Sequence, residues 1–326
     1  MSQTSDPVSE ILENQTSEAF PKGTLACVLG TFNKNWYEGE MKDETDVDKL
    51  RGDLALETAK TLVESGHHCI VVDGGSSHVL LNTFTELGAT VQKEEKVGMS
   101  ASKQQGFAYA SKLLGVEIIA HLEPEKISMA KCIEMVAFPI LRDEADIIIP
   151  KRNSESFRTY PPYQAIIEKR SNRLFNNILR TAGLLLPEDE DLDVWFGPRI
   201  FRNDPRIVDL FLREFSYEQL QERVGERIKP GLWSNATFFP VIAALYEGYR
   251  VKGVEIPYEH PEAQTKMELD SKNLETFIEK RKAQQRGIII ATAEFIRWLH
   301  HNEWDQGNCM SDHKPKLSQL VLVRDN

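Results

Sequence analysis

The chain has 326 residues, of which 41% are hydrophobic and 27% are charged, and its formal net charge is −11. This length is sufficient for one large domain or two small ones. Because nucleic acids and anionic membranes repel an acidic chain, we expect neither to be a partner.

Both ends of the sequence are polar. Residues 1–22 lack the basic start and the apolar stretch of a signal peptide, and no apolar segment approaches the roughly 20 residues of a membrane span. We therefore expect a soluble cytoplasmic protein with flexible tails at 1–22 and 306–326. No two cysteines have the spacing of zinc ligands, and we interpret all of them as reduced core thiols. They are Cys27, Cys69, Cys132 and Cys309.

Short apolar runs alternate with amphipathic segments in the first half of the chain. The runs predict β-strands at 24–32, 67–77, 89–95, 116–123 and 145–152. The amphipathic segments predict helices at 46–65, 78–87, 100–114 and 127–144. Strands and helices that alternate in this way form βαβ units, so we expect an α/β fold with a mostly parallel sheet flanked by helices. In such a sheet, ligands bind beyond the carboxyl ends of the strands.

The second half of the chain is less regular. It predicts, in order, a long helix within 160–183, a strand at 193–203, a helix at 235–248 that Pro240 kinks, a strand at 249–260 and an amphipathic helix at 271–304. There is no internal repeat. We expect a single large domain over residues 23–305, with halves at 23–152 and 153–305.

Two of the predicted strands end in small polar turns. The first ends in LGTF, where Gly30 and Thr31 let the backbone come close to a ligand, although a plain turn into a loop fits the same residues. The second ends in VVDGG, where Asp73 is followed by Gly74. The carboxylate of Asp73 can accept hydrogen bonds from a base or a ribose, or it can cap the next turn. The first of these ends has neither the glycine pattern of a dinucleotide fingerprint nor that of a P-loop.

The stretch KVGMSASKQQG (96–106) leads into a predicted helix. Gly98 and Ser100 precede that helix, and the helix carries Lys103. Backbone amides at a helix N-terminus, together with a lysine, suit a diphosphate. A capped surface helix is the alternative interpretation.

The fourth strand ends in two acids, Glu123 and Glu125, on either side of Pro124. Oxygen ligands in this arrangement suit a hard divalent cation, which would bridge the two phosphates of a nucleotide diphosphate. His260 follows a later strand and would supply an imidazole ligand. A solvated acidic turn and an exposed loop histidine are the alternatives. We interpret the histidine doublet at 67–68 as surface residues.

These motifs, in this order, resemble those of family 2-like glycosyltransferases of the GT-A fold between residues 24 and 260. The family's common forms are a strand with a small polar turn, VDDGS, a GxxxARNxG-like stretch and DxD. The resemblance implies a Rossmann-like GT-A sheet and a nucleoside diphosphate sugar as donor, either UDP-hexose or GDP-hexose, bound by the half at 23–152. The residues that it implies for nucleotide-sugar binding are Gly30, Thr31, Asn33, Asp73, Gly74, Gly98, Ser100, Lys103 and Glu123.

The resemblance also implies a divalent cofactor, Mn²⁺ or Mg²⁺, held by Glu123, Glu125 and His260. Here ExE stands where the family has DxD, and its longer side chains need different distances to a metal. Inverting relatives carry an acid pair at the start of a late helix, whereas GLWSNATFF (231–239) contains no acid. The sequence is therefore most similar in pattern to the retaining transferases that make glucosyl- or mannosyl-glycerates. Asp193 is a weak candidate for a catalytic base.

The half at 153–305 is expected to bind the acceptor, which would be a small molecule or a glycan. The stretch PKRNSESFRTYPPY (150–163) is basic and aromatic, and it follows a strand end that faces the expected site. A solvated loop is the alternative. The residues that we expect to contact the acceptor are Arg152, Arg158, Tyr160, Gly197 and Trp233.

The sequence thus predicts a hexosyltransferase, and it does not decide whether the protein forms a homodimer. One alternative is a nucleotidyltransferase of the sugar pyrophosphorylase kind, which would need a glycine- and arginine-rich phosphate loop that LGTFNKN does not provide. The other alternative is a catalytically inactive GT-A domain that acts as a binding module, which the ExE triplet and the missing acid pair would fit.

Overall fold

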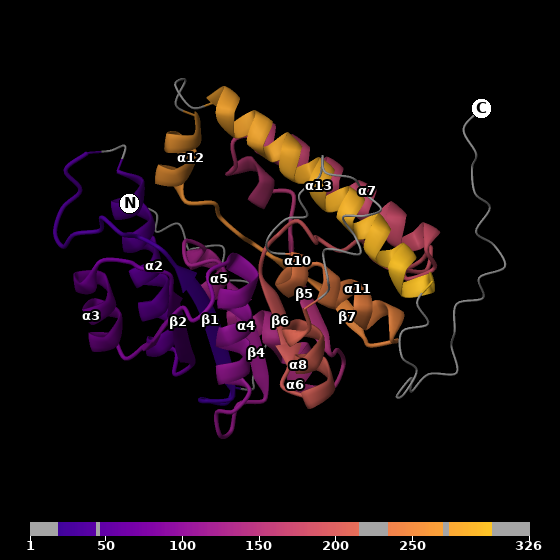
Figure 1. The fold of residues 1–326 in the computed structure, drawn as a ribbon, viewed down its shortest axis with the longest axis horizontal. Helices are drawn as coiled ribbons and strands as arrows, with labels where there is room; N and C mark the ends of the chain where they lie inside the picture. Colours follow the sequence, from indigo (N-terminus) through magenta and orange to yellow (C-terminus); the bar gives the residue numbers. More distant parts are fainter. Residues whose placement is uncertain (1–18, 44–45, 215–233, 270–273, 302–326) are drawn as a thin grey trace, which may run out of the picture.

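The computed structural model describes residues 19–43, 46–214, 234–269 and 274–301 (Figure 1). They contain a seven-stranded sheet with the strand order β3-β2-β1-β4-β6-β5-β7. The strands are β1 (Leu25–Thr31), β2 (His68–Asp73), β3 (Thr90–Lys93), β4 (Ile118–Leu122), β5 (Ile147–Arg152), β6 (Arg199–Arg202) and β7 (Val251–Ile256). An α/β fold with a mostly parallel sheet is confirmed.

One strand runs against the others. β6 pairs antiparallel with both β4 and β5, whereas the remaining pairs in the sheet are parallel. It is also shorter than the strand that we predicted at 193–203, because Phe196 and its neighbours form a turn that precedes Arg199. The antiparallel direction of β6 was not predicted from the sequence.

Helices cover both faces of the sheet, which explains why the strands read as continuous apolar runs. Along β1, Ala26 and Val28 belong to one core cluster, whereas Leu25, Cys27 and Leu29 belong to the other. The first cluster is completed by α4 (Met99–Ala110), α7 (Pro162–Thr181), α8 (Pro205–Leu212), α10 (Ser234–Thr237), α11 (Phe239–Tyr246) and α13 (Leu274–His301). The second is completed by α2 (Val47–Glu64), α3 (His78–Glu86), α5 (Ile127–Lys131) and α6 (Ile133–Leu141). The short helices η1 (Ser156–Arg158) and α12 (Glu262–Leu269) complete the described elements.

Two predicted helices are each divided. The segment 127–144 forms α5 and α6, which are separated at Cys132, where φ is −98° and ψ is 1°. The segment 235–248 forms α10 and α11, and Pro240 lies in the first turn of α11 instead of kinking one continuous helix. The interpretation of Cys27 and Cys69 as reduced core thiols is confirmed, because both are free and buried, and Cys132 is buried in the core as well. Cys309 lies outside the described residues.

The interpretation of His67 as a surface residue is wrong. The ring of Phe20 packs edge-on against His67 and against Phe138, and the three side chains are buried together. His67 Nε2 lies 3.1 Å from Glu134 Oε1, and burial lowers the pKa of His67 to about 4. Phe20 therefore contributes to the packed core, although it belongs to the segment that we predicted to be a tail.

A glycine determines how closely α4 approaches the sheet. A Cβ atom at Gly106 would lie only 2.2 Å from Cγ1 of Val28 in β1, so a larger residue would push the helix away. Lys103 lies one turn before Gly106 on the same helix. The close contact between α4 and β1 therefore sets the depth at which Lys103 lies. None of the described helices is both long and apolar enough to cross a membrane.

Candidate functional site

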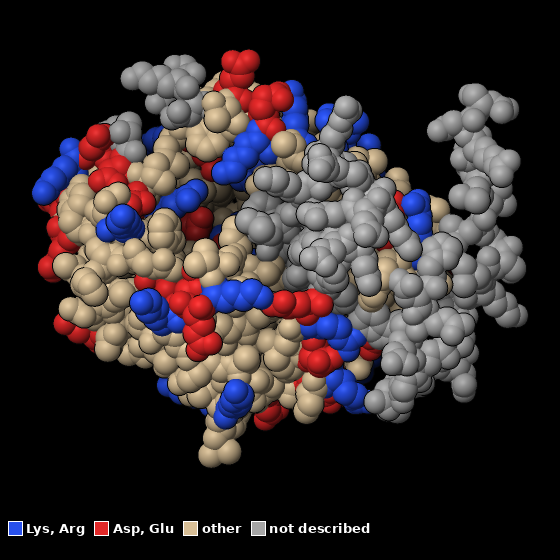
Figure 2. Space-filling view, viewed as in Figure 1, with Lys and Arg blue, Asp and Glu red and all other residues tan. Residues whose placement is uncertain are grey.

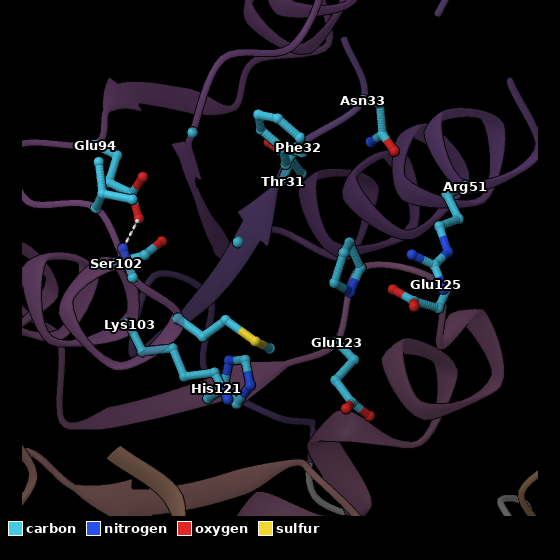
Figure 3. A pocket seen from close by; sticks show the side chains of 16 residues that line it. Thr31, Phe32, Asn33, Arg51, Glu94, Ser102, Lys103, His121, Glu123 and Glu125 are labelled. Carbon is cyan, nitrogen blue, oxygen red and sulfur yellow. Dashed lines mark hydrogen bonds between the residues drawn. The ribbon is translucent and has the colours of Figure 1, made fainter. Parts of the chain in front are cut away.

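A cavity of about 550 Å³ opens beyond the carboxyl ends of β1, β2 and β4 (Figure 3). Its volume falls within the range of small-molecule binding sites, roughly 300 to 1,000 Å³. Basic and acidic side chains are interspersed over the face of the molecule drawn in Figure 2. The cavity is lined by eight of the residues that we predicted for donor or metal binding: Gly30, Thr31, Asn33, Gly74, Gly98, Lys103, Glu123 and Glu125.

The strand register explains why these residues meet. Thr31 at the end of β1 is paired with Asp73 at the end of β2, and Leu29 is paired with Leu122 of β4. The next residue after Leu122 is Glu123, which therefore reaches the same edge of the sheet as Gly30. Parallel strands bring their carboxyl ends to one edge, and the cavity lies at that edge.

Asp73 is buried beneath the cavity and does not line it. Its Oδ1 accepts a hydrogen bond from Thr31 Oγ1 at 3.0 Å. Its Oδ2 accepts hydrogen bonds from the backbone N–H groups of Gly75 at 2.8 Å and Ser76 at 2.9 Å. The carboxylate thus fixes the turn after β2 against the end of β1, which is the capping role that the sequence left open.

Phe32 is a lining residue that the sequence reasoning missed, although it stands inside the motif LGTFN. Its side chain is 65% exposed, and it stands against the glycines of the β2 turn. A Cβ atom at Gly74 would lie 3.4 Å from the Phe32 ring, and one at Gly75 would lie 3.6 Å from it. The glycines therefore leave room for an aromatic face that points into an open cavity.

A group of nitrogen-bearing side chains forms one wall of the cavity. Lys103 of α4 and His121 of β4 lie beside one another there (Figure 3), and Arg199 of β6 is buried next to them. Burial and the charge of Arg199 lower the pKa of Lys103 to about 7. Burial, and to a smaller extent the charge of Lys103, lower the pKa of His121 well below its ordinary value. A neutral His121 donates a hydrogen bond from Nδ1 to the Val28 carbonyl oxygen at 3.3 Å.

Arg199 is held almost entirely by backbone carbonyl groups. It donates hydrogen bonds to the carbonyl oxygens of Val194 at 2.7 Å and Thr237 at 3.0 Å. Lys103 donates to Thr237 Oγ1 at 3.2 Å. Burial lowers the pKa of Arg199 to about 9. Because these cations are desolvated, an anionic ligand in the cavity would be attracted more strongly than it would be in water.

Gly98 and Ser100 at the start of α4 are less available to a diphosphate than we predicted. The N–H group of Gly98 donates a hydrogen bond to Glu94 Oε1 at 3.1 Å, which is the dashed line in Figure 3. Gly98 has a φ of 141°, which favours glycine. Ser100 is buried and does not line the cavity. Lys103 is therefore the residue of this stretch that is best placed to contact a phosphate.

The acidic triplet lies in a turn directly after β4. The N–H group of Lys126 donates to the Glu123 carbonyl oxygen at 3.0 Å, which closes the turn. The Lys126 ammonium group lies 2.8 Å from Glu123 Oε2 and 4.5 Å from the centre of the Phe196 ring. Burial, and secondly the charge of Arg152, lower the pKa of Lys126 to about 7. Lys126 was missed, because the sequence shows only that a lysine follows two acids.

Gly197 lies against the same carboxylate. A Cβ atom at Gly197 would be 2.6 Å from Cδ of Glu123, so the Gly197 backbone closes one side of that group. We predicted that Gly197 binds the acceptor, and the structure places its backbone against the Glu123 carboxylate.

His260 is not part of the cavity lining. Its ring stacks on Tyr160 with 4.3 Å between the centroids, and its Nε2 lies 3.9 Å from Glu268 Oε2. Burial lowers the pKa of His260 to about 3. Within the part of the chain that the structure describes, no group of three or more His, Cys, Asp or Glu side chains is arranged to hold a metal ion. The donor set of Glu123, Glu125 and His260 therefore does not fit a divalent cation.

The arginines predicted for acceptor binding already have partners. Arg152 is buried, and its Nε lies 2.8 Å from Asp193 Oδ2 while its Nη1 lies 2.5 Å from Glu168 Oε2. Arg158 is exposed and forms an ion pair with Glu155. Tyr160 is buried, and Trp233 lies outside the described residues.

Asp193 is fully engaged by this pairing. Burial raises its pKa, but the charge and hydrogen bonds of Arg152 outweigh that effect, and the net pKa of Asp193 is below its ordinary value. Asn172 Nδ2 also donates to Asp193 Oδ1. Asp193 does not line the cavity, so its role as a base stays a prediction.

No family model and no curated protein matches the chain. Among solved structures, glucosyl-3-phosphoglycerate synthase from Mycobacterium tuberculosis, in complex with Mn²⁺, UDP and phosphoglyceric acid, is similar to it with a TM-score of 0.49 and 13% identity, over 84% of this chain and 78% of that chain. A complex of the same synthase with Mn²⁺, UDP-glucose and phosphoglyceric acid has a TM-score of 0.46 and 11% identity, over 91% of this chain and 86% of that chain.

A protein from Desulfovibrio desulfuricans, provisionally described as a nucleotide-diphospho-sugar transferase, has a TM-score of 0.42 and 9% identity, over 81% of this chain and 97% of that chain. The descriptions of the two synthase complexes name UDP and UDP-glucose, and that of the third protein names a nucleotide-diphospho-sugar transferase.

Proposed function

We propose that this protein is a glycosyltransferase that moves a hexose from a nucleoside diphosphate sugar to a hydroxyl group of an acceptor. One observation carries the proposal: the ends of β1, β2 and β4 and the start of α4 meet around a single cavity of about 550 Å³. The cavity offers an aromatic face, a desolvated cation and carboxylates, which match the base, the diphosphate and the sugar of such a donor.

The exposed ring of Phe32 provides a surface on which a nucleobase stacks. Asn33, which also lines the cavity, offers an amide that can both donate and accept hydrogen bonds at the base or the ribose. We extend the proposal to UDP-hexose or GDP-hexose as the donor, as the resemblance implies.

Lys103 meets the diphosphate in this arrangement. Transfer breaks the bond between the anomeric carbon of the hexose and an oxygen of the diphosphate, and a bond from that carbon to the acceptor oxygen replaces it. Negative charge develops on the departing diphosphate oxygen, which takes up the proton of the acceptor hydroxyl group. A desolvated ammonium group that is already in place stabilises this charge more than water does. Glu123 and Glu125 line the cavity and accept hydrogen bonds from hydroxyl groups of the hexose. No step is routed through a divalent cation.

The stereochemical part of the proposal is retention of the anomeric configuration. It rests on the absence of an acid in GLWSNATFF (231–239), of which residues 231–233 lie outside the described residues. It agrees with the pairing of Asp193, whose two oxygens are occupied by Arg152 and Asn172.

The experiment is a release assay with a panel of nucleoside diphosphate hexoses, with and without small polyol and glycan acceptors. We expect one donor to yield free nucleoside diphosphate, and we expect Lys103→Met to reduce that yield at least tenfold at pH 6.5. Binding without any release would identify the second candidate, an inactive binding module, which the occupied carboxylates of Glu123 and Asp193 favour. Absence of both binding and release would refute the proposed function.

A further inference from the structure

We propose that the protein binds its donor without a divalent cation, because the ammonium group of Lys126 takes the place that a metal would have at Glu123. The inference rests on the proposed function, since it concerns how the same cavity accepts a diphosphate. In a metal site, the cation cancels the repulsion between the acidic triplet and the diphosphate. Here a side chain of the protein cancels it.

The first support is the ion pair itself. Lys126 Nζ lies 2.8 Å from Glu123 Oε2, and the Lys126 side chain is only 13% exposed. A cation that bound Glu123 through this oxygen would have to displace an ammonium group that is largely removed from water. The Coulomb attraction of such a pair is stronger than that of a pair at the surface.

The second support is the packing that holds both partners. The Lys126 ammonium group lies over the rings of Phe196, at 4.5 Å, and Tyr258, at 5.2 Å, and the faces of both rings attract it. Gly197 follows Phe196 directly, and its backbone closes the other side of the Glu123 carboxylate. In the turn before β6, Phe196 therefore positions Lys126, and Gly197 confines the carboxylate of Glu123.

The third support is the missing ligand set. A divalent cation in a protein normally has several oxygen or nitrogen ligands. Glu125 lies in the same cavity as Glu123, but His260 is stacked on Tyr160 outside the lining. Among residues 19–43, 46–214, 234–269 and 274–301, no three side chains of the ligating types are arranged to hold a metal ion.

The cations that line the cavity are consistent with this arrangement. Of the lining acids, Glu94 accepts a hydrogen bond from the N–H group of Gly98, and Glu123 is neutralised by Lys126. Lys103 and Arg51 are the cations among the described lining residues. A diphosphate diester carries two negative charges, which Lys103 and Arg51 attract, while Glu94 and Glu125 remain as lining acids.

The test is isothermal titration calorimetry with nucleoside diphosphate hexoses at pH 6.5, once in EDTA and once in Mn²⁺. We expect the dissociation constants in the two buffers to agree within about twofold. Binding that improves tenfold or more in Mn²⁺ would overturn the inference and leave the proposed function standing. If no donor bound in either buffer, the proposed function would fail, and the inference would fail with it.

Variants at the lysine give the second measurement. Lys126→Met keeps an unbranched side chain on Phe196 but removes the charge, so it should weaken donor binding in EDTA about tenfold and make binding improve when Mn²⁺ is added. Lys126→Arg should restore most of the affinity in EDTA. The control is Lys282→Met, since Lys282 forms an ion pair at the same spacing and distance with Glu279 on an exposed face of α13. A Lys126→Met protein that folds and binds donor in EDTA like the wild type would overturn the inference.

Discussion

The ammonium group of Lys103 in the cavity wall and the buried guanidinium group of Arg199 both reach Thr237. Burial and the charge of Arg199 lower the pKa of Lys103 from 10.5 to about 7. Two positive charges this close repel one another, and a bound diphosphate would relieve that repulsion.

Donor affinity should therefore depend on pH. Below pH 7 Lys103 is already protonated, so affinity should change little. Above pH 7 binding must take up a proton, and affinity should fall by up to about tenfold per pH unit. Lys126 titrates in the same range, whereas His121 stays neutral and Arg199 stays charged to about pH 9. Calorimetry with a nucleotide sugar, whose phosphates keep their charge over this range, measures the slope. A Lys103→Met protein with an unchanged slope would contradict the assignment.

Phe32→Ala should weaken donor binding without weakening the fold. The ring is 65% exposed in the free protein, so its removal costs little stability. Stacking of a base on an aromatic ring contributes about 1–3 kcal/mol, and binding should weaken by that amount. The matched control is Leu114→Ala, because Leu114 is fully exposed and does not line the cavity. Equal donor affinity in the two variants would exclude Phe32 from the base site.

Asp193→Asn should destabilise the protein. The change leaves the buried guanidinium group of Arg152 with Glu168 alone, and loss of one partner from a buried ion pair costs about 3–5 kcal/mol. Urea denaturation measures the difference in the free energy of unfolding. The matched control is Asp191→Asn, whose partner Arg180 lies on the surface, and this change should cost at most about 1 kcal/mol. An Asp193→Asn protein of wild-type stability that had lost turnover would instead identify Asp193 as a base.

Gly106→Ala should also destabilise the protein, although alanine favours helices over glycine by about 1 kcal/mol. The added methyl group would meet Val28 at 2.2 Å, and overpacking of this kind costs about 1–3 kcal/mol beyond the helix preference. Because Val28→Ala removes the atom that clashes, a double-mutant cycle should show a favourable coupling between the two changes. Additive effects of the two substitutions would show that α4 does not contact β1 at this point.

Gly197→Ala tests how Glu123 is confined. The new methyl group would lie 2.6–2.8 Å from the Glu123 carboxylate, and this flexible group can move aside. We therefore expect little loss of stability but about a tenfold loss of donor affinity, since the ion pair with Lys126 would be disturbed. Gly253→Ala is the control, because a methyl group there would meet no atom closer than 3.7 Å. If donor affinity fell equally in both variants, the loss could not be attributed to a displaced Glu123 carboxylate.

Much of the donor side of the cavity could be predicted from short segments of sequence. Apolar runs that alternate with amphipathic segments predict a parallel sheet, and a parallel sheet brings its carboxyl ends to one edge. Thr31, Lys103 and Glu123 were therefore expected to lie near one another, and they line one cavity. Phe32 could have been found in the same way, because it stands between Thr31 and Asn33 in a strand-end motif.

The acceptor side could not be predicted to the same degree. Arg152 reads as an arginine in a basic loop, yet it is buried between Asp193 and Glu168. Asp193 lies 41 residues further along the chain, and nothing in either segment indicates the other. His260 likewise reads as a free loop histidine, but Tyr160 covers its ring.

The sequence by itself determined the order of strands and helices and the residues at each strand end, because the spacing of apolar residues is a property of neighbouring positions. Only the tertiary structure decided the antiparallel direction of β6 and the partners of Lys126, Arg152 and Arg199. The energy of a charge depends on its distance from other charges and from water, and those distances exist only once remote segments have packed together.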